Sequence, residues 1–445
     1  MRVSVFTVIP GQEPLRESAA AARAGRVPSM SLESANMPGG LQVDPTFAAV
    51  PIGSGDANSG LLMAAMTPET SDNFVVRAFV EANDPQSVPA EVDGRALFAD
   101  PVIAPYITCG GTLPVGGVPQ VQTGLNLAAM HGRGLDGTGV AVAIMDTGIN
   151  LKHLQQKLGY MPRLDAAHSW SPAGVTNAPG AHPVHHGTMC AFDALIGAPK
   201  ATLLDFPILR SSAPGGSTSG STLSTAVQAY AQLIAFWGVA FAPGGTYAAL
   251  VVNNSWGIFH PSWDFPASHP GRYIDNPNHP FNALVSVLAR TGADILFAAG
   301  NCGAQCPDIR CQGRTTGAIM GANASLDVLT LAGCDTGNLR VGYSSQGPSI
   351  ANMPPQKPDV TAYTHFLGSE AFGVGSPDSG TSAACPVAAG CVAAIRTKVS
   401  PYTTPPASLF AQLRATANPV GPAGWNGDYG HGIINPDSCA LTLGV

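Results

Sequence analysis

The chain has 445 residues, of which 45% are hydrophobic and only 11% are charged, and its formal net charge is −7. This length allows one large α/β domain and a smaller one, with a sizeable core. The acidic balance excludes the basic surface that nucleic acids and anionic membranes attract, so neither partner is expected. With 52 glycines and 39 prolines, many ordered loops should connect the regular elements.

The first 125 residues differ in pattern from the rest. Residues 3–9 are a short apolar run with charged residues soon after it, which favours a first β-strand over a secretory signal. The stretch 18–71, rich in Ser, Ala, Gly and Pro, shows little periodicity, and 73–80 predicts a second strand. A glycine- and proline-rich connector spans 109–117. We therefore expect residues 1–125 to form a smaller N-terminal α+β or irregular region, similar to an accessory domain or pro-domain.

The cellular compartment stays open at this point. No clear targeting signal is visible, whereas nine cysteines and a low charge would suit an exported enzyme. The protein is therefore cytoplasmic or exported by a non-classical route. The longest apolar segment, 226–243, is interrupted by polar residues and lies between strand-like segments, so a buried helix is expected there rather than a membrane span.

Residues 126–445 form the second expected domain, in which strand-like and helical patterns alternate. Residues 139–145 are a nearly continuous apolar run, as expected of a strand buried on both faces. Further strands are expected at 201–209, 248–253, 295–299, 328–332 and 340–344, and helices at 186–196, 223–237, 281–291 and 382–398. This alternation predicts a mostly parallel sheet with helices on both faces and a ligand site at the carboxyl ends of the strands.

Three segments with reactive side chains follow one another in a fixed order. Asp146 ends the apolar strand in V-A-V-A-I-M-D-T-G, His186 opens a helix in H-H-G-T-M-C-A, and Ser382 opens a later helix in S-G-T-S-A-A-C-P-V-A-A-G. A serine hydroxyl becomes a nucleophile when an imidazole takes its proton, and the imidazole needs a carboxylate that fixes its tautomer. Each segment alone could be a turn or a helix cap. Together they predict a catalytic set.

This order of Asp, His and Ser resembles that of the subtilisin family of serine peptidases, and the resemblance covers roughly residues 126–440. A fourth segment, F-A-A-G-N, places Asn301 after a strand, where the family carries an amide that binds the oxyanion. The resemblance implies an α/β, three-layer subtilisin-like fold with a mostly parallel sheet. It also implies that Asp146 orients His186 as the general base and that Ser382 is the nucleophile. The Ser382 N–H would be the second oxyanion donor, and the implied reaction is hydrolysis of peptide bonds through an acyl-enzyme, with no cofactor.

The resemblance also implies where a peptide binds. The edge strand that pairs with substrate would comprise Asn254, Ser255, Trp256 and Gly257, and the other wall of the first specificity pocket would comprise Ala298, Ala299 and Gly300. Main-chain pairing gives affinity, while pockets read alternate side chains. The expected partner is a peptide or protein substrate in extended conformation. The segment 260–280 could overhang this cleft or form a rigid surface loop.

Two further histidines, His182 and His185, raise the alternative of a metal site, but only His186 precedes Gly-Thr at a helix start. We expect the other two to be loop residues that line the cleft, and we expect no metal site. Cys190, one helical turn after His186, resembles the cysteine beneath the catalytic histidine in the proteinase K-like branch of the family. Gln155 replaces the family's strong calcium-binding aspartate, so that calcium site should be absent.

Three cysteines, Cys302, Cys306 and Cys311, cluster directly after Asn301. A zinc site would need a fourth ligand and usually tighter pairing. A disulfide that ties this loop, with Cys334 as a candidate partner, is therefore the favoured interpretation. Such a disulfide would hold Asn301 in position and link redox state to activity.

Three alternatives to hydrolysis by a subtilisin-like enzyme stay open. A transpeptidase or peptide macrocyclase would use the same residues but shield the acyl-enzyme from water. A sedolisin-type acid peptidase shares the Gly-Thr-Ser motif but pairs it with carboxylates and an oxyanion aspartate. This chain has His186 and Asn301 instead, so a neutral or alkaline optimum is expected. A non-catalytic binding protein could retain the fold without the reaction.

Overall fold

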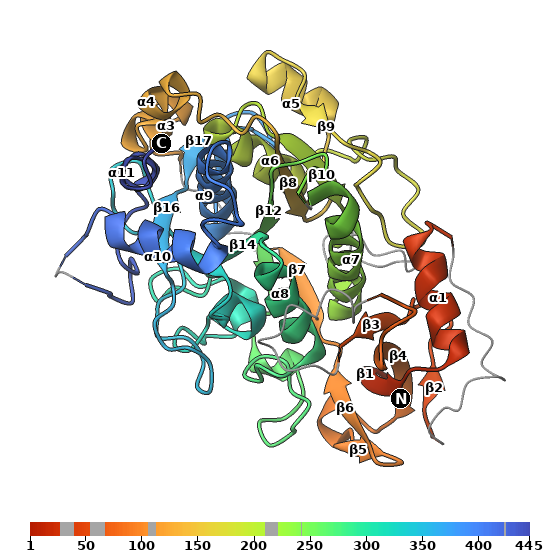
Figure 1. Cartoon of the computed structure of the whole chain (residues 1–445). Helices are drawn as coiled ribbons and strands as arrows, with labels where there is room; N and C mark the ends of the chain where they lie inside the picture. Colours follow the sequence, from red (N-terminus) through yellow and green to blue (C-terminus); the bar gives the residue numbers. More distant parts are fainter. Residues whose placement is uncertain (27–39, 54–66, 106–112, 210–220, 242, 422–423) are drawn as a thin grey trace.

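Two sheets organise the chain, an antiparallel sheet from residues 2–99 and a parallel sheet from residues 140–363 (Figure 1). The computed structural model describes residues 1–26, 40–53, 67–105, 113–209, 221–241, 243–421 and 424–445. Part of the predicted connector, 109–112, therefore lies outside the described residues.

The parallel sheet has seven strands in the order β16-β15-β14-β12-β8-β10-β9. Its strands are β8 (Val140–Met145), β9 (Arg163–Leu164), β10 (Thr202–Phe206), β12 (Ala249–Asn254), β14 (Asp294–Ala298), β15 (Leu329–Cys334) and β16 (Val360–Tyr363). All neighbouring strands run parallel, which confirms the predicted sheet. Strands β9 and β16 were not predicted from the sequence, because strands of two and four residues are too short to show a period.

Helices cover both faces of the parallel sheet (Figure 1). One face carries α6 (His186–Gly197) and α9 (Thr381–Arg396), and the other carries α7 (Leu223–Phe236) and α8 (Pro280–Arg290). In β8, Val142 belongs to the core under α6 and α9, whereas its neighbour Ala143 belongs to the core on the opposite face. A strand buried on both sides needs an unbroken apolar sequence, as predicted. The three-layer α/β architecture is confirmed.

Smaller helices complete this part of the chain: α3 (Val118–Gly124), α4 (Leu127–Gly132), α5 (Leu151–Leu158), α10 (Pro406–Thr416) and α11 (Pro436–Thr442). The apolar segment 226–243 forms most of α7 and the π-helical turn Trp237–Phe241 that follows it. Among the residues that the structure describes, no helix combines the length and the hydropathy that a membrane span requires.

The N-terminal region forms a second, antiparallel sheet of order β2-β4-β1-β6-β5, with β3 also paired to β4. Its elements are β1 (Arg2–Pro10), α1 (Glu13–Arg23), β2 (Gln42–Val43), β3 (Val50–Ile52), β4 (Asn73–Glu81), β5 (Glu91–Val92) and β6 (Arg95–Ala99). The strands β1 and β4 confirm the two that the sequence predicts. One continuous apolar core includes this sheet together with α7 and α8, so the N-terminal sheet packs on that helical layer (Figure 1).

A small third sheet joins the two regions. The strand β7 (Val102–Pro105) lies between β11 (Ser221–Thr222) and β13 (Trp256–Gly257) and runs antiparallel to both. The chain is next described from Leu113, where it contacts the hairpin of β17 (Phe366–Leu367) and β18 (Pro377–Asp378). The N-terminal region and its continuation are thus attached to different sides of the larger body.

The strand predicted at 340–344 is wrong. Apart from an isolated bridge between Arg340 and Cys334, this segment turns back on itself, with Ser344 N–H donating to Val341 O at 3.0 Å. The Arg340 guanidinium donates to Ser344 O at 3.0 Å and fixes the turn. The alternating side chains fitted a strand, but two of the backbone carbonyls that a sheet would need accept N–H groups of the cysteine loop: Gly342 O from Cys306 and Tyr343 O from Gly303.

Candidate active site

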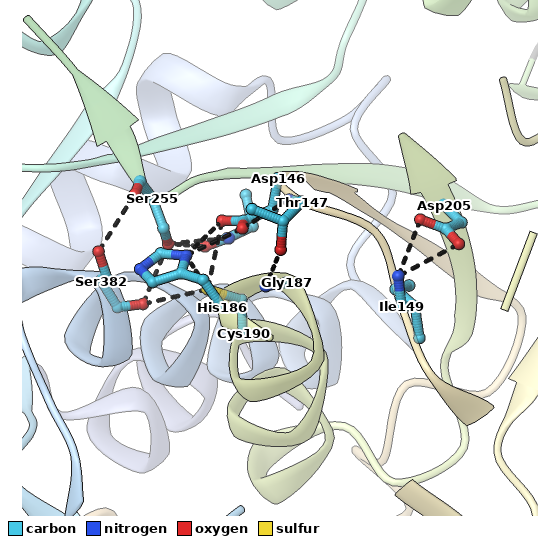
Figure 2. A network of polar contacts seen from close by, with 10 residues as sticks. Asp146, Thr147, Ile149, His186, Gly187, Cys190, Asp205, Ser255 and Ser382 are labelled. Atoms are coloured by element: carbon cyan, nitrogen blue, oxygen red, sulfur yellow. Dashed lines mark hydrogen bonds and ion pairs between the residues drawn. The ribbon is translucent and has the colours of Figure 1, made fainter. Parts of the chain in front are cut away.

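A buried Asp146–His186 pair forms where the end of β8 meets the start of α6 (Figure 2). His186 Nδ1 lies 2.9 Å from each carboxylate oxygen of Asp146, and neither residue is more than 1% exposed. Thr147 N–H also donates to Asp146 Oδ1, at 2.7 Å. Because a carboxylate only accepts hydrogen bonds, Nδ1 carries the proton, and Nε2 of the neutral ring is left as a base.

The glycine after His186 allows this close approach. A Cβ at Gly187 would lie 2.7 Å from Gly148 O and 3.2 Å from Asp146 Cβ. Gly187 N–H donates instead to Thr147 Oγ1 at 2.9 Å. A side chain at this position would push the start of α6, and His186 with it, away from the carboxylate.

Ser382 lies in the first turn of α9, beside the imidazole (Figure 2). Its Oγ donates to Ser255 O at 3.1 Å, and Figure 2 places the Ser382 side chain on the Nε2 side of the ring. His186 Nε2 makes no hydrogen bond within the part of the chain that the structure describes. The Ser382 carbonyl accepts Ser255 Oγ–H at 3.0 Å, which fixes the backbone of the serine.

Asn301 follows β14 and is held by the residue before the serine. Its Oδ1 accepts the Thr381 N–H at 3.0 Å and the Thr381 hydroxyl at 3.1 Å. The same hydroxyl accepts Gly300 N–H at 3.0 Å. Since a backbone N–H can only meet the carbonyl end of the amide, these contacts orient Asn301 and direct Nδ2 away from Thr381. Thr381 is a positioning residue that the sequence analysis did not single out.

Cys190 lies beneath the pair, as the resemblance implies. Its Sγ is 3.5 Å from Asp146 Oδ2 and 3.7 Å from His186 Nδ1. Burial, reinforced by the charge of Asp146, raises the pKa of Cys190 well above its usual range. The thiol therefore stays protonated and acts as a weak donor and a small core side chain.

The prediction that both neighbouring histidines line the cleft is wrong for His182. That ring is fully buried, with Nε2 3.6 Å from Asp205, whose carboxylate also accepts Ile149 N–H. His185 is half-buried and makes an edge contact with Phe372 at 5.6 Å between ring centroids. Within the described ranges, the grouping of ligand atoms compact enough for a metal ion is Asp146, His186 and Cys190, which includes neither of these histidines.

The cysteine loop after Asn301 contains a disulfide between Cys302 and Cys311, with a Cα–Cα distance of 5.7 Å. Cys306 is also disulfide-bonded. The proposed pairing with Cys334 is wrong, because Cys334 is a free and buried thiol at the end of β15. Asn301 O accepts Asp308 N–H at 2.9 Å inside this loop, so the loop holds the backbone of the asparagine.

The predicted substrate strand is occupied by the chain itself. In β13, Gly257 pairs with Ala104 and Trp256 pairs with Pro105 of β7. The side chains of this segment face the core: Asn254 Nδ2 donates to Leu296 O at 3.1 Å, and the Trp256 ring is fully buried. Its backbone is therefore what meets β7, in the antiparallel manner of β-augmentation.

The other predicted wall, Ala298 to Gly300, lies close to the substrate strand. Asn323 joins the two, since its Nδ2 donates to Trp256 O at 3.0 Å and to Ala298 O at 2.9 Å. Ala299 N–H donates to Leu331 O, and Gly300 adopts a φ of 102° that favours glycine. No sequence signal pointed to Asn323, because its partners come from two distant strands.

Adjacent parallel strands β8, β12 and β14 explain why these residues meet. Asp146 directly follows β8, Ser255 directly follows β12, and Asn301 follows β14 by three residues. Helices α6 and α9 begin at the same rim and add His186 and Ser382. A serine, an imidazole and a buried carboxylate at this rim define a serine hydrolase of the Asp–His–Ser type.

Comparison with known proteins identifies the family. Residues 137–432 match the subtilase family, and the chain belongs to it. An alkaline protease from Alkalihalobacillus alcalophilus is 25% identical over 363 residues, which are 79% of this chain and 77% of that protein. Subtilisin Savinase from Lederbergia lenta is 25% identical over 329 residues, 72% of this chain and 97% of that protein.

The solved structure of a lanthipeptide protease shares the fold, with a TM-score of 0.50 at 17% identity over 74% of this chain and 99% of that one. The chain described here is a serine endopeptidase with a subtilisin-like fold, and its substrates are peptides or proteins.

Proposed function

We propose that the four residues predicted from the sequence carry the reaction. Ser382 Oγ attacks the substrate carbonyl, and His186 Nε2 takes its proton. Asp146 holds the proton on Nδ1 and stabilises the imidazolium that forms. His186 then protonates the leaving amine, and a water molecule hydrolyses the acyl-enzyme with the same imidazole as base. The observation that carries this proposal is the buried 2.9 Å contact between Asp146 and His186, with Ser382 beside the ring.

The oxyanion is the second part of the proposal. Asn301 Nδ2 and the backbone N–H of Ser382 donate to the oxygen that becomes negative in the tetrahedral intermediate. The position of Ser382 in the first turn of α9 adds the favourable end of the helix dipole. The hold of Thr381 on Asn301 Oδ1 supports this role, because a fixed donor needs no reorganisation when the charge develops.

We also propose that the N-terminal region is an intramolecular inhibitor which the enzyme cuts from itself. The pairing of β7 with β13 supports this, because β7 lies along the strand that an extended substrate would use. The part of a substrate before the scissile bond would then lie along β13 in the same direction as β7, with the scissile carbonyl at Ser382. The division at residue 125 stays a prediction; the functional division proposed here lies shortly after Pro105.

Intact-mass analysis of the purified chain beside Ser382→Ala tests both parts. We expect the wild type to be cut between Pro105 and Val118 and Ser382→Ala to stay whole. A fluorophosphonate should label the cut wild type on Ser382 and leave the variant unlabelled. A Ser382→Ala chain cut at the same bond would remove the self-processing proposal, and labelling at another residue would remove the assigned nucleophile.

A further inference from the structure

The hairpin of β17 and β18 carries an aromatic side chain that lies against the catalytic imidazole. Phe372, in the loop between the two strands, makes edge contacts with His185 and His186, at 5.6 Å and 6.4 Å between ring centroids. The side chain of Phe372 is 43% exposed, so much of its ring is open to solvent. None of the catalytic roles proposed above uses this side chain.

The direction of β7 shows where a substrate continues after the scissile bond. Pro105, the last residue of β7, pairs with Trp256, the first residue of β13. Ser255 directly precedes β13, and its carbonyl accepts the hydroxyl of Ser382 at 3.1 Å. A peptide that follows the course of β7 therefore reaches the nucleophile as it leaves the substrate strand. Its next residue lies beyond Ser382, away from β13.

That next residue belongs to the leaving group, and the proposed reaction brings it close to His186. The imidazole protonates the leaving amine, so the amine nitrogen must lie within hydrogen-bond reach of the ring. Phe372 contacts the same ring, and its hairpin forms a two-stranded sheet separate from β13. Phe372 is therefore placed to contact the first side chain after the scissile bond.

The course of this chain beyond β7 leads to the same hairpin. The chain is next described from Leu113, whose carbonyl lies 3.1 Å from His365 Nε2, and Gly117 then forms a parallel bridge with Leu367 of β17. Helix α3, which follows directly, also lies near β17 (Figure 1). A polypeptide that leaves the substrate strand thus continues towards the hairpin that carries Phe372.

Bonds within the loop and to α5 hold Phe372 in place. Glu370 forms an ion pair with Lys157 of α5, and its carboxylate also accepts Gly375 N–H at 2.7 Å. The main-chain carbonyl of Glu370 accepts Gly373 N–H at 3.1 Å. These bonds join residues on both sides of Phe372 in the sequence. The ring therefore needs little reorganisation when a substrate binds.

The side chains around this position favour an apolar ligand. Val184 directly precedes His185 and is 37% exposed, and Val374 follows Phe372 by two residues and is 96% exposed. An apolar side chain that covers the Phe372 ring removes apolar surface of both groups from water. A hydrated side chain would lose water there without gaining a hydrogen bond from Phe372.

We propose that Phe372 is a specificity-determining residue, which selects substrates with an apolar side chain directly after the scissile bond. The inference deepens the function proposed above and rests on Ser382 as the nucleophile. The Phe372 ring, beside His185, forms a surface on which that side chain packs while His186 delivers the proton to the leaving amine. This selection acts on the leaving group and does not depend on pairing with β13.

Peptides that differ only in the residue after the scissile bond test this proposal. With the cleaved bond verified by mass spectrometry, kcat/KM for leucine or phenylalanine at this position should exceed that for serine by about tenfold or more. In Phe372→Ala this ratio should fall to about twofold, and Phe372→Leu should restore most of it. Tyr402→Ala is the matched control and should keep the wild-type ratio. Tyr402 is a similarly exposed aromatic residue, at 49%, and lies beyond the end of α9 that is remote from Ser382.

A peptide methyl ester separates selectivity from a general loss of activity. Its leaving group is methanol, which carries no side chain, so Phe372→Ala should hydrolyse the ester at the wild-type rate. The proposal is wrong if the wild type shows no preference, or if Phe372→Ala keeps the preference. It is also wrong if the ester rate falls in step with every peptide, because the ring would then only support the imidazole. If Ser382→Ala hydrolyses the ester as fast as the wild type, the assigned nucleophile is wrong, and the subsite with it.

Discussion

The rim of the parallel sheet and the N-terminal region meet where β7 pairs with β13, but they depend on different interactions. At the rim, polar side chains are fully buried. Asp146 accepts the backbone N–H of Thr147, and Asn301 accepts that of Thr381. The N-terminal sheet instead packs through an apolar face on α7 and α8, and the strand β7 that follows it pairs by its backbone with β13, the predicted substrate strand. Side-chain chemistry should therefore be separable from strand pairing by substitution.

Asp146→Asn should give the largest effect among the predictions made here. The amide keeps the shape of the side chain but can donate to Nδ1, so it favours the tautomer with the proton on Nε2, where a base is needed. We expect kcat to fall by about 10⁴-fold. Steady-state kinetics on a peptide substrate measures this. The variant should keep the wild-type melting temperature within a few degrees, and β7 should remain paired with β13.

If Asp146→Asn retained more than a tenth of the activity, another group would have to orient His186. The assignment of the catalytic chemistry to the side chains of the rim would then be wrong for Asp146. Asp205→Asn provides a contrast. Asp205 pairs with the buried His182, away from Ser382, and its substitution should lower stability more than kcat.

The hold of Thr381 on Asn301 gives the next prediction. Removing a single oxyanion donor costs about 10²–10³ in kcat, so Asn301→Ala should lose that much. Thr381→Val removes one of the two bonds to Oδ1 and the bond to Gly300 N–H. We expect it to lose about tenfold in kcat with KM little changed, which kinetics on the same peptide will show.

Thr381→Ser is the control, since it keeps the hydroxyl and should restore most of the activity. The double variant Asn301→Ala with Thr381→Val should be no worse than Asn301→Ala alone, because Thr381 acts through Asn301. Additive losses would instead mean that Thr381 acts on the substrate or on Ser382 directly.

The meeting of the four predicted residues at one rim could be foreseen from the sequence for a physical reason. Asp146 and Asn301 directly follow or lie close to the ends of apolar strands, and His186 and Ser382 open helices, so each position is encoded by its immediate neighbours. Parallel topology then brings strand ends to one rim, whatever the loop lengths between them. Local sequence patterns therefore indicated a site whose residues lie far apart along the chain.

Features that depend on distant partners were missed or wrong. The alternating segment 340–344 looked like a strand but forms a turn, whose backbone also bonds to the distant residues Gly303 and Cys306. Nothing in the four residues of β7 indicates which strand edge they join. Cysteine spacing did not identify Cys311 as the partner of Cys302. The buried position of His182 was also missed, because its neighbour Asp205, whose carboxylate accepts the Ile149 N–H, comes from a separate strand.

The Cys302–Cys311 disulfide lies in the loop after Asn301 and gives a further prediction for the rim of the parallel sheet. Replacing both cysteines by alanine removes one of the disulfides in the loop that holds the backbone of Asn301, while that of Cys306 remains. Closing a loop of this length stabilises by about 2–3 kcal/mol in the chain-entropy description, so thermal unfolding should shift down accordingly. We expect kcat to drop severalfold, because the oxyanion donor is less well fixed.

Cys439→Ala is the comparison variant, since it removes a buried free thiol on α11, away from this loop. It should lower stability without a fall in kcat. A double alanine variant with wild-type kcat would show that the Cys302–Cys311 disulfide is not needed to position Asn301.

The smallest effect concerns two carboxyl groups buried between α6 and β18. Asp193 and Asp378 are fully buried, and Ser369 donates to Asp378 through its N–H and its hydroxyl. Burial raises the pKa of Asp193 well above its usual range, and the negative charge of the neighbouring Asp378 raises it further. Burial also raises the pKa of Asp378, to about 6. Asp193 is therefore the member of the pair that keeps its proton to the higher pH.

The sign of the pH effect follows from proton counting. In the unfolded chain both aspartates lose their protons near pH 4, whereas the folded pair keeps a proton above that pH. The folded state then binds more protons, so the free energy of unfolding falls as pH rises above about 4, and it continues to fall past 6 while Asp193 keeps its proton. Asp193→Asn has no proton to lose. Urea denaturation between pH 5 and 7 should show a decline in the wild type, of about 1.4 kcal/mol per pH unit for each proton that only the folded state holds, and the decline should be smaller in Asp193→Asn. The exposed Asp93→Asn should follow the wild-type curve, and parallel curves for all three chains would mean that this pair does not titrate with folding. Activity should not change, because Asp193 lies two turns of α6 beyond His186, away from the rim where the reaction takes place.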